Sequence, residues 1–278
     1  MSDYENYSKI ARRYDATRIP VGVEIITGCL AQGDTPLHQQ HLLDAGCGTG
    51  NYSRALLPRV GRISAVDLNA GMLAHARKKF AAESARDRID FHRASIDALP
   101  FEDAVFDGVM VNQVLHHLEL AAAADYPVYR RVIGEFARVL KPDGALVVNT
   151  CSREQLRHGF WYYHLIPEAT ARMCARHAPR EVLRQIMADA GIPCRRCFVP
   201  VDALMQGEAY FNPRGPLDKS WRDGDSMWSM VSERTLREVR ARVRELERSG
   251  ELQNYLLKND ARRKHIGQFS FLYGRRSL

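Results

Sequence analysis

The chain has 278 residues, of which 45% are hydrophobic, and it carries a net charge of +7 and six cysteines. This length suffices for one large α/β domain, and the hydrophobic content is typical of a globular protein. No run of 18 apolar residues occurs, which argues against a membrane-spanning helix. The first residues lack the basic and apolar regions of a secretion signal, and the cysteines are scattered. We therefore expect a cytoplasmic protein with free thiols.

Much of the excess positive charge lies in residues 233–278, which contain 12 Lys or Arg and 6 Asp or Glu. This segment could form a patch for nucleic acid or an anionic substrate. It could equally be a solvated helix face, because charges of opposite sign alternate along it. We favour the second interpretation and expect no nucleic-acid partner.

Residues 1–30 have the pattern of an interrupted amphipathic helix. Tyr4, Tyr7, Ile10 and Tyr14 recur at intervals of three or four residues. Residues 21–30 predict a second helix, which a Gly-Asp-Thr-Pro segment ends.

The central motif of the chain is a glycine-rich turn. An apolar strand predicted at residues 41–45 leads into Gly46, Gly48 and Gly50, and helical sequence follows. Strand, glycine turn and helix together predict a site for a nucleotide-like ligand. A dinucleotide fingerprint would need glycine at position 51, where this chain has Asn51.

The pattern of acid, then glycine at alternate positions, resembles motif I of the class I S-adenosylmethionine (SAM) dependent methyltransferases. The resemblance implies that the cofactor is held by the residues of this turn, namely Asp44, Gly46, Cys47, Gly48 and Asn51. The Tyr-Asp-x-x-Arg segment at residues 14–18 resembles the cap that folds over SAM in small-molecule methyltransferases. By that resemblance Tyr14 and Arg18 lie near the methionine carboxylate, although Arg18 could instead form a surface ion pair.

The second predicted strand, at residues 61–67, ends in Asp67. An acid at this place in a doubly wound sheet accepts hydrogen bonds from ribose hydroxyls. The following turn resembles the acid-x-Ser-x-x-Met-Leu turn of the family, which places Leu68 and Met72 beside the adenine. Met72 taken alone could equally be a core residue.

Residues 88–94 predict the third strand, followed by Ser95, Ile96 and Asp97. This segment resembles an Asp-Ala-Glu-x-Leu-Pro-Phe element in which the first acid accepts from the adenine amino group. Here Ser95 stands at that acid's position and Asp97 at that of the Glu. The adenine site is still expected, with Ile96 offering its backbone to the ring.

The fourth strand is predicted at residues 106–112 and leads into Val-Leu-His-His-Leu. Asn112 and Gln113 then fall where the sulfonium of SAM should meet the methyl acceptor. His117 is the better of two adjacent candidates for a general base, although histidines in this motif often serve packing.

A helix at residues 128–140, a Lys-Pro-Asp-Gly turn and an apolar fifth strand at 145–150 complete the resembling region. The next segment combines aromatic residues with a histidine, which suits the wall of an acceptor pocket. We expect Trp161, Tyr162 and Tyr163 to contact substrate and His164 to be a second candidate base. The same aromatics could instead pack in a core.

The remaining sequence predicts a helix at 179–191, a strand at 193–201, a helix at 232–248 and a last strand at 268–274. Cys194 and Cys197 form a C-x-x-C pair, but no second pair completes a zinc site, so we expect no metal. Residues 202–232 are irregular, which suggests a lid or a substrate wall.

The predicted fold class is α/β, with a doubly wound seven-stranded sheet. The sheet is mostly parallel with an antiparallel last strand, and a helical cap and an insertion are added. We expect a single methyltransferase domain over residues 1–278. It comprises a cap at 1–40, a SAM-binding core at 41–150, and a substrate-side half at 151–278 with an insertion at 202–232.

The resemblance implies an enzyme that moves a methyl group from SAM to a small-molecule acceptor by in-line displacement, releasing S-adenosylhomocysteine (SAH). We expect the acceptor atom to be oxygen. Three alternatives remain: C- or N-methylation, a nucleic-acid or protein acceptor, and a SAM-binding protein without catalysis.

Overall fold

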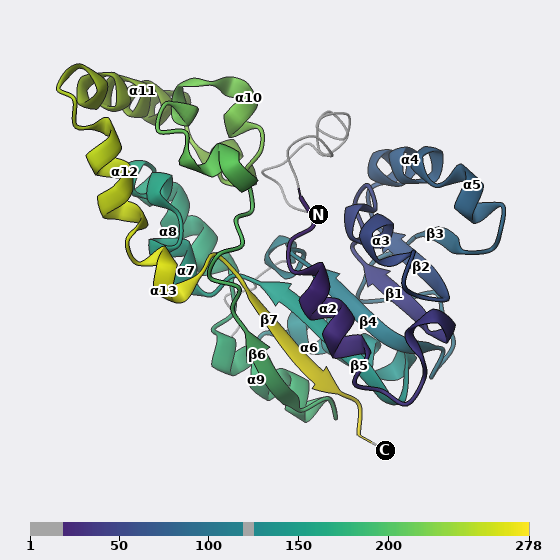
Figure 1. The fold of residues 1–278 in the computed structure, drawn as a ribbon. Coiled ribbons are helices and arrows are strands. Elements are labelled where there is room, and N and C mark those ends of the chain that lie inside the picture. Colours follow the sequence, from purple (N-terminus) through teal and green to yellow (C-terminus); the bar gives the residue numbers. More distant parts are fainter. Residues whose placement is uncertain (1–18, 119–124, 278) are drawn as a thin grey trace.

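The computed structural model describes residues 19–118 and 125–277. Within them, seven strands form one sheet in the order β3-β2-β1-β4-β5-β7-β6 (Figure 1). Neighbouring strands from β3 to β5 run parallel, and β7 is antiparallel to β5 and to β6. The strands are β1 His41–Ala45, β2 Arg62–Asp67, β3 Ile89–Arg93, β4 Phe106–Asn112, β5 Leu140–Thr150, β6 Cys194–Phe198 and β7 Ser270–Arg275. The predicted doubly wound sheet, with its antiparallel last strand between the fifth and sixth, is confirmed.

The helices divide between the two faces of the sheet and a separate group beyond one end of it (Figure 1). The α-helices are α2 Val23–Leu30, α3 Asn51–Leu56, α4 Ala70–Lys79, α5 Ala81–Ser84, α6 Pro127–Val139, α7 Arg153–His158, α8 Pro167–Arg176, α9 Arg180–Asp189, α10 Lys219–Arg222, α11 Glu233–Arg248, α12 Leu252–Asp260 and α13 Arg263–Ile266. The 3-10 helices are η1 Leu37–Gln39, η2 Leu115–His117, η3 Trp161–Leu165, η4 Gly207–Phe211, η5 Gly215–Leu217 and η6 Ser226–Met230.

Alternating side chains of the strands feed two cores. On one face, Leu42 of β1 and Val147 of β5 pack with α2 and α3. On the other, Leu43 of β1 and Val148 of β5 pack with α6 and α9. This alternation follows from the two-residue period of a strand, and a sheet covered on both faces explains the apolar runs that made the strands predictable.

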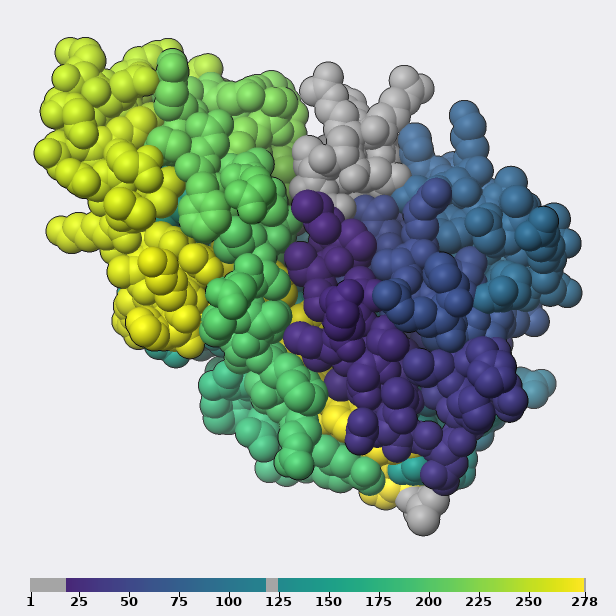
Figure 2. All heavy atoms as spheres, viewed as in Figure 1, coloured from purple at the N-terminus to yellow at the C-terminus, as the bar shows by residue number. Residues whose placement is uncertain are grey.

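Residues 153–176 and 203–266 form a helical lobe beside the sheet, drawn in teal, green and yellow in Figure 1; its green and yellow part is seen in Figure 2. Its aromatic core is continuous with the first face of the sheet, since Trp161 and Phe271 of β7 belong to one buried cluster. A buried ion pair joins Arg263 to Asp260 through two hydrogen bonds of 2.7 and 2.9 Å, and Asp260 also accepts from the Tyr210 hydroxyl at 2.5 Å. These contacts fix η4 of the predicted insertion to the start of α13.

The structure corrects two details of the prediction. The Lys-Pro-Asp-Gly turn before the fifth strand belongs to β5, which begins at Leu140 and pairs irregularly with β4. Residues 202–232, which were predicted as irregular, contain the short helices η4, η5, α10 and η6. Within the described residues, no helix has both the length and the apolar character that crossing a bilayer requires.

Candidate cofactor and acceptor site

A cavity of about 300 Å³ lies at the carboxyl ends of β1, β2, β3 and β4, where a doubly wound sheet binds its ligands. Residues of the loops that follow these strands form its walls. Those predicted from the sequence are Gly46, Gly48, Asp67, Leu68, Met72, Ser95, Ile96, Asp97, Asn112, Gln113 and His117. The structure therefore brings together most of the residues expected at the cofactor, and we call this space the cofactor cavity.

The glycine turn is formed by backbone that other residues adopt poorly. Gly46 has φ +79°, and a Cβ atom built on it would lie 2.5 Å from the Val114 side chain. The N–H groups of Gly46 and Cys47 both donate to the carbonyl of Val66, at 2.8 and 2.9 Å. One side of the turn thus lies against the end of β2, and the other side faces the cavity.

Asp67 connects the turn to the next loop. One carboxylate oxygen accepts from the N–H of Gly48 and the other from the N–H of Asn69, both at 2.8 Å. Burial raises the pKa of this carboxyl. Because each carboxylate oxygen has two lone pairs, Asp67 retains acceptor capacity on the side of the cavity.

Three residues expected at the cofactor do not line the cavity. Asp44 is 1% exposed and accepts from the Ser53 hydroxyl at 2.7 Å, and burial raises its pKa to about 7. Asn51 accepts from the Lys79 ammonium at 2.8 Å, and Cys47 is half-buried beside them. Asp44 and Asn51 therefore support the turn without lining the cavity. Tyr14 and Arg18 lie outside the described residues.

On the cavity wall that follows β3, Ser95 and Asp97 are in direct contact. The Ser95 hydroxyl hydrogen-bonds to one oxygen of Asp97, and Arg131 contacts the other at 3.2 Å. The carboxylate absent at position 95 is therefore present two residues later, on the same wall.

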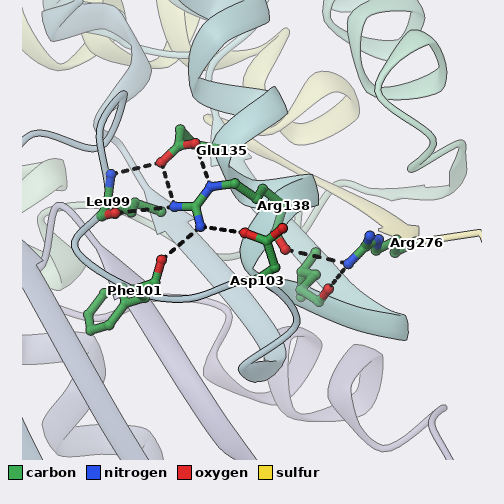
Figure 3. Close-up of polar contacts among 7 residues, drawn as sticks. Leu99, Phe101, Asp103, Glu135, Arg138 and Arg276 are labelled. Carbon is green, nitrogen blue, oxygen red and sulfur yellow. Dashed lines mark hydrogen bonds and ion pairs between the residues drawn. The ribbon is translucent and has the colours of Figure 1, made fainter.

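The loop after Asp97 is held by Arg138 of α6 (Figure 3). Its guanidinium donates to the carbonyls of Phe101 and Leu99 at 2.7 and 3.2 Å and to Asp103 at 2.8 Å. Glu135 pairs with the same guanidinium and accepts from the N–H of Leu99 at 2.8 Å. Two side chains of α6 thus fix the backbone of the loop that follows the cavity wall at Asp97.

At the end of β4, Asn112 and Gln113 have contrasting surroundings. Gln113 adopts φ +55°, and its N–H and side-chain amide donate to the backbone and side chain of Asn149, both at 2.9 Å. Among the residues that the structure describes, neither polar side-chain atom of Asn112 has a hydrogen-bond partner, although both are buried. A buried amide without partners is costly, so Asn112 has the character of a ligand-binding group.

A second cavity, of about 50 Å³, adjoins the first, and we call it the inner cavity. Gln113 and His117 line both spaces. Tyr163 and Asp225 of the helical lobe also line the inner cavity. Its remaining walls are His116, Cys151, Leu156, Phe160, Met173, His177, Met205 and Ser226.

Three histidines stand together on this wall. The His116 ring centroid lies 4.0 Å from that of His117 and 5.0 Å from that of His177. The rings of His116 and His177 are stacked, with an angle of 13° between their planes. His177 lies just after α8, and no pattern around it in the sequence indicated a site. Asp225 belongs to the insertion, where the wall prediction was general and named no residue.

The structure places the three residues predicted to contact substrate in different surroundings. Tyr163 lines the inner cavity, but Trp161 and Tyr162 are fully buried within the lobe. Trp161 donates to the carbonyl of Tyr210 at 2.8 Å, and Tyr162 donates to Asp225 at 2.5 Å. His164 lines a different, open cavity together with Arg157, so the structure does not place it with His117.

Comparison with known proteins identifies the core. Residues 43–148 match the methyltransferase domain family. An uncharacterized methyltransferase of Mycobacterium tuberculosis is 31% identical over 143 residues, covering 51% of this chain and 66% of the relative. A demethylmenaquinone methyltransferase of Symbiobacterium thermophilum is 33% identical over 129 residues, covering 44% of this chain and 48% of that protein. The match thus spans 66% of the first of these relatives and 48% of the second.

A solved structure matches nearly the whole fold. A crystal structure described as a putative methyltransferase from an antibiotic biosynthesis pathway of Anabaena variabilis has a TM-score of 0.71 at 20% identity. The match covers 93% of this chain and 98% of that one, so the helical lobe belongs to the shared architecture. The order of the sheet, the glycine turn and the family match together identify residues 43–148 as a domain of the class I SAM-dependent methyltransferases.

Proposed function

We propose that the chain binds SAM in the cofactor cavity and transfers its methyl group to a small-molecule acceptor. The cavity suits this cofactor in three ways. Asp67 has acceptor capacity for ribose hydroxyls, Leu68 and Met72 offer apolar contacts to adenine, and the buried amide of Asn112 has no partner among the described residues. When bound, SAM supplies a methyl group on a positively charged sulfur, which a nucleophile attacks without prior activation of the donor.

The observation that carries the proposal is the junction of the two cavities at Gln113 and His117. Among the described residues, these two stand where an acceptor in the inner cavity would meet the cofactor. Gln113 is fixed by its two bonds to Asn149, which gives the junction a rigid side. Holding two reactants in line at such a junction can contribute roughly 7–11 kcal/mol to lowering a barrier.

We propose oxygen as the atom methylated. His117 borders both cavities, where a base would take the proton of an acceptor hydroxyl. Residues 151–278 then form the acceptor side of one methyltransferase domain, through Tyr163 and Asp225.

A carbon acceptor is the second candidate. It is favoured by the relative whose name, demethylmenaquinone methyltransferase, denotes a quinone substrate. Removing the proton of a ring hydroxyl makes both its oxygen and the neighbouring ring carbons nucleophilic, so His117 would serve either reaction. Mass spectrometry of the product, with and without mild ether cleavage, distinguishes them.

The first experiment is calorimetric titration with SAM and with SAH. We expect micromolar binding of both, and Asp67→Ala should weaken it 10- to 100-fold, because hydrogen bonds to a charged group contribute about 1.5–3 kcal/mol. Asp34→Ala, at an exposed aspartate outside the cavity, is the matched control. Absence of binding to the folded protein would overturn the proposal.

The second experiment screens phenols, carboxylates and amines with methyl-labelled SAM. With an acceptor in hand, His117→Ala should lower kcat by at least a factor of 100, whereas His164→Ala should leave it within twofold. A nucleic-acid acceptor would instead appear as salt-dependent retention on immobilised RNA. SAM binding without any turnover would favour a non-catalytic role.

A further inference from the structure

His177 is a buried histidine with one ring nitrogen left unpaired. The residue is 2% exposed and lines the inner cavity. Its Nδ1 lies 3.0 Å from the carbonyl oxygen of Met173. A carbonyl can only accept, so Nδ1 carries the proton and donates it. In the neutral ring, Nε2 is then an acceptor, and among the described residues it has no partner.

The surroundings of His177 keep the ring in this state. Its face stacks on His116, whose backbone carbonyl accepts from Arg176 at 3.1 Å. Arg153 donates to the carbonyl of His177 itself at 3.0 Å. Burial, together with these two arginines, lowers the pKa of His177 to about 4. At neutral pH the ring therefore offers a lone pair and no second proton.

The other polar groups of the inner cavity do not satisfy this lone pair. The Tyr163 hydroxyl is committed to Asp225, to which it donates at 2.9 Å, and Tyr162 donates to the same oxygen at 2.5 Å. The Cys151 thiol contacts the side-chain oxygen of Gln113 at 3.6 Å. An unsatisfied buried acceptor costs about 1–3 kcal/mol, and a ligand that donates to it recovers part of that free energy.

We propose that His177 Nε2 accepts a hydrogen bond from a hydroxyl of the methyl acceptor, so the inner cavity selects uncharged hydroxy compounds, alcohols or phenols. His177 lines only the inner cavity, whereas His117 lines both cavities. His177 is accordingly a specificity residue that reads the acceptor, and it abstracts no proton. At about 50 Å³ the inner cavity takes the hydroxyl and the atoms next to it, and the apolar side chains of Leu156, Phe160 and Met173 suit those atoms. This inference rests on the proposed function for its biological meaning.

The test uses phenol and its methyl ether, anisole, as probes, because they share a ring and differ in one donor. Each is titrated into the free and the SAH-loaded protein. Phenol should bind about fivefold more tightly than anisole, as expected for one hydrogen bond of about 1 kcal/mol. In ¹⁵N-histidine spectra, phenol alone should move the unprotonated nitrogen resonance of His177 upfield.

His177→Leu should abolish the preference for phenol and leave SAH affinity unchanged. His164→Leu, at a histidine of the neighbouring open cavity, is the matched control and should keep the preference. If His177→Leu fails to fold, the nitrogen shift of the wild-type protein decides alone.

Equal binding of phenol and anisole, binding of neither, or an unmoved His177 resonance would overturn the inference. Failure of SAH to bind would instead count against the proposed function, and the titration of the free protein would still decide the role of His177.

Discussion

Replacing Asp225 by alanine should destabilise the helical lobe where it borders the inner cavity. The Asp225 carboxylate is 4% exposed and accepts three hydrogen bonds. Two come from the hydroxyls of Tyr162 and Tyr163, at 2.5 and 2.9 Å, and the third from the N–H of Met227 at 2.9 Å. Alanine leaves all three donors buried without this acceptor.

The size of the effect follows from those contacts. Hydrogen bonds to a charged group contribute about 1.5–3 kcal/mol each, and three would sum to about 5–9 kcal/mol. Water entering the vacated space should recover part of this, so we expect a loss of about 4 kcal/mol in the free energy of unfolding. Tyr162→Phe removes one of the three bonds and should cost about 1.5 kcal/mol.

Urea unfolding followed by tryptophan fluorescence measures this loss. The Trp221 ring lies 4.8 Å and the Trp228 ring 6.1 Å from the ring of Tyr162, so the signal reports this region. Asp223→Ala is the matched control, because Asp223 pairs with Lys219 near the surface. That change should cost no more than about 1 kcal/mol. A loss below about 1 kcal/mol for Asp225→Ala would refute the reasoning.

Three further predictions concern the turn, the pH dependence and the cavity wall. Gly46→Ala should weaken SAH binding at least tenfold in calorimetry, because φ +79° and the contact with Val114 both disfavour a Cβ atom; unchanged affinity would contradict it. The pKa of His177 is about 4 in the folded state and 6.5 unfolded, so its contribution to stability is complete above pH 6.5 and declines by up to about 3 kcal/mol as pH falls to 4. Asp44 has the opposite sign over this range, so the test is the difference between wild type and His177→Leu in urea unfolding at pH 7.5 and pH 5, and equal losses would contradict it. Arg138→Ala should lower the melting temperature by several degrees by freeing the loop in Figure 3, as thermal unfolding with Lys141→Ala as control would show.

The sheet could be predicted because its strands are buried on both faces. Apolar runs such as 106–112 and 145–150 give their positions, and the acid at the end of β2 and the glycine turn give the site. These features depend on residues close together in sequence, which is why most residues predicted from them lie around one cavity.

The helical lobe could not be predicted in the same way, because its contacts join distant parts of the chain. Tyr162 and Asp225 are separated by 63 positions, and no periodicity relates them. The aromatic cluster at 160–163 indicated apolar surroundings correctly, but only the packed lobe decides that Tyr163 faces a cavity while Trp161 faces a core. For the same reason, the sequence could not show that His164 and His117 line different cavities.

The position of β7 between β5 and β6 has a consequence for how the chain is made. Within the described sheet, β6 is hydrogen-bonded to β7 alone. During synthesis, Cys194–Phe198 therefore waits unpaired until Ser270–Arg275 emerges, which takes several seconds at about 5–20 residues per second. The whole of α10 to α13 leaves the ribosome in that interval. The part of the lobe that follows β6 must then fold while the edges of β5 and β6 still lack their partner strand β7. During this interval the nascent chain is exposed to pairing of these edges with the wrong strand.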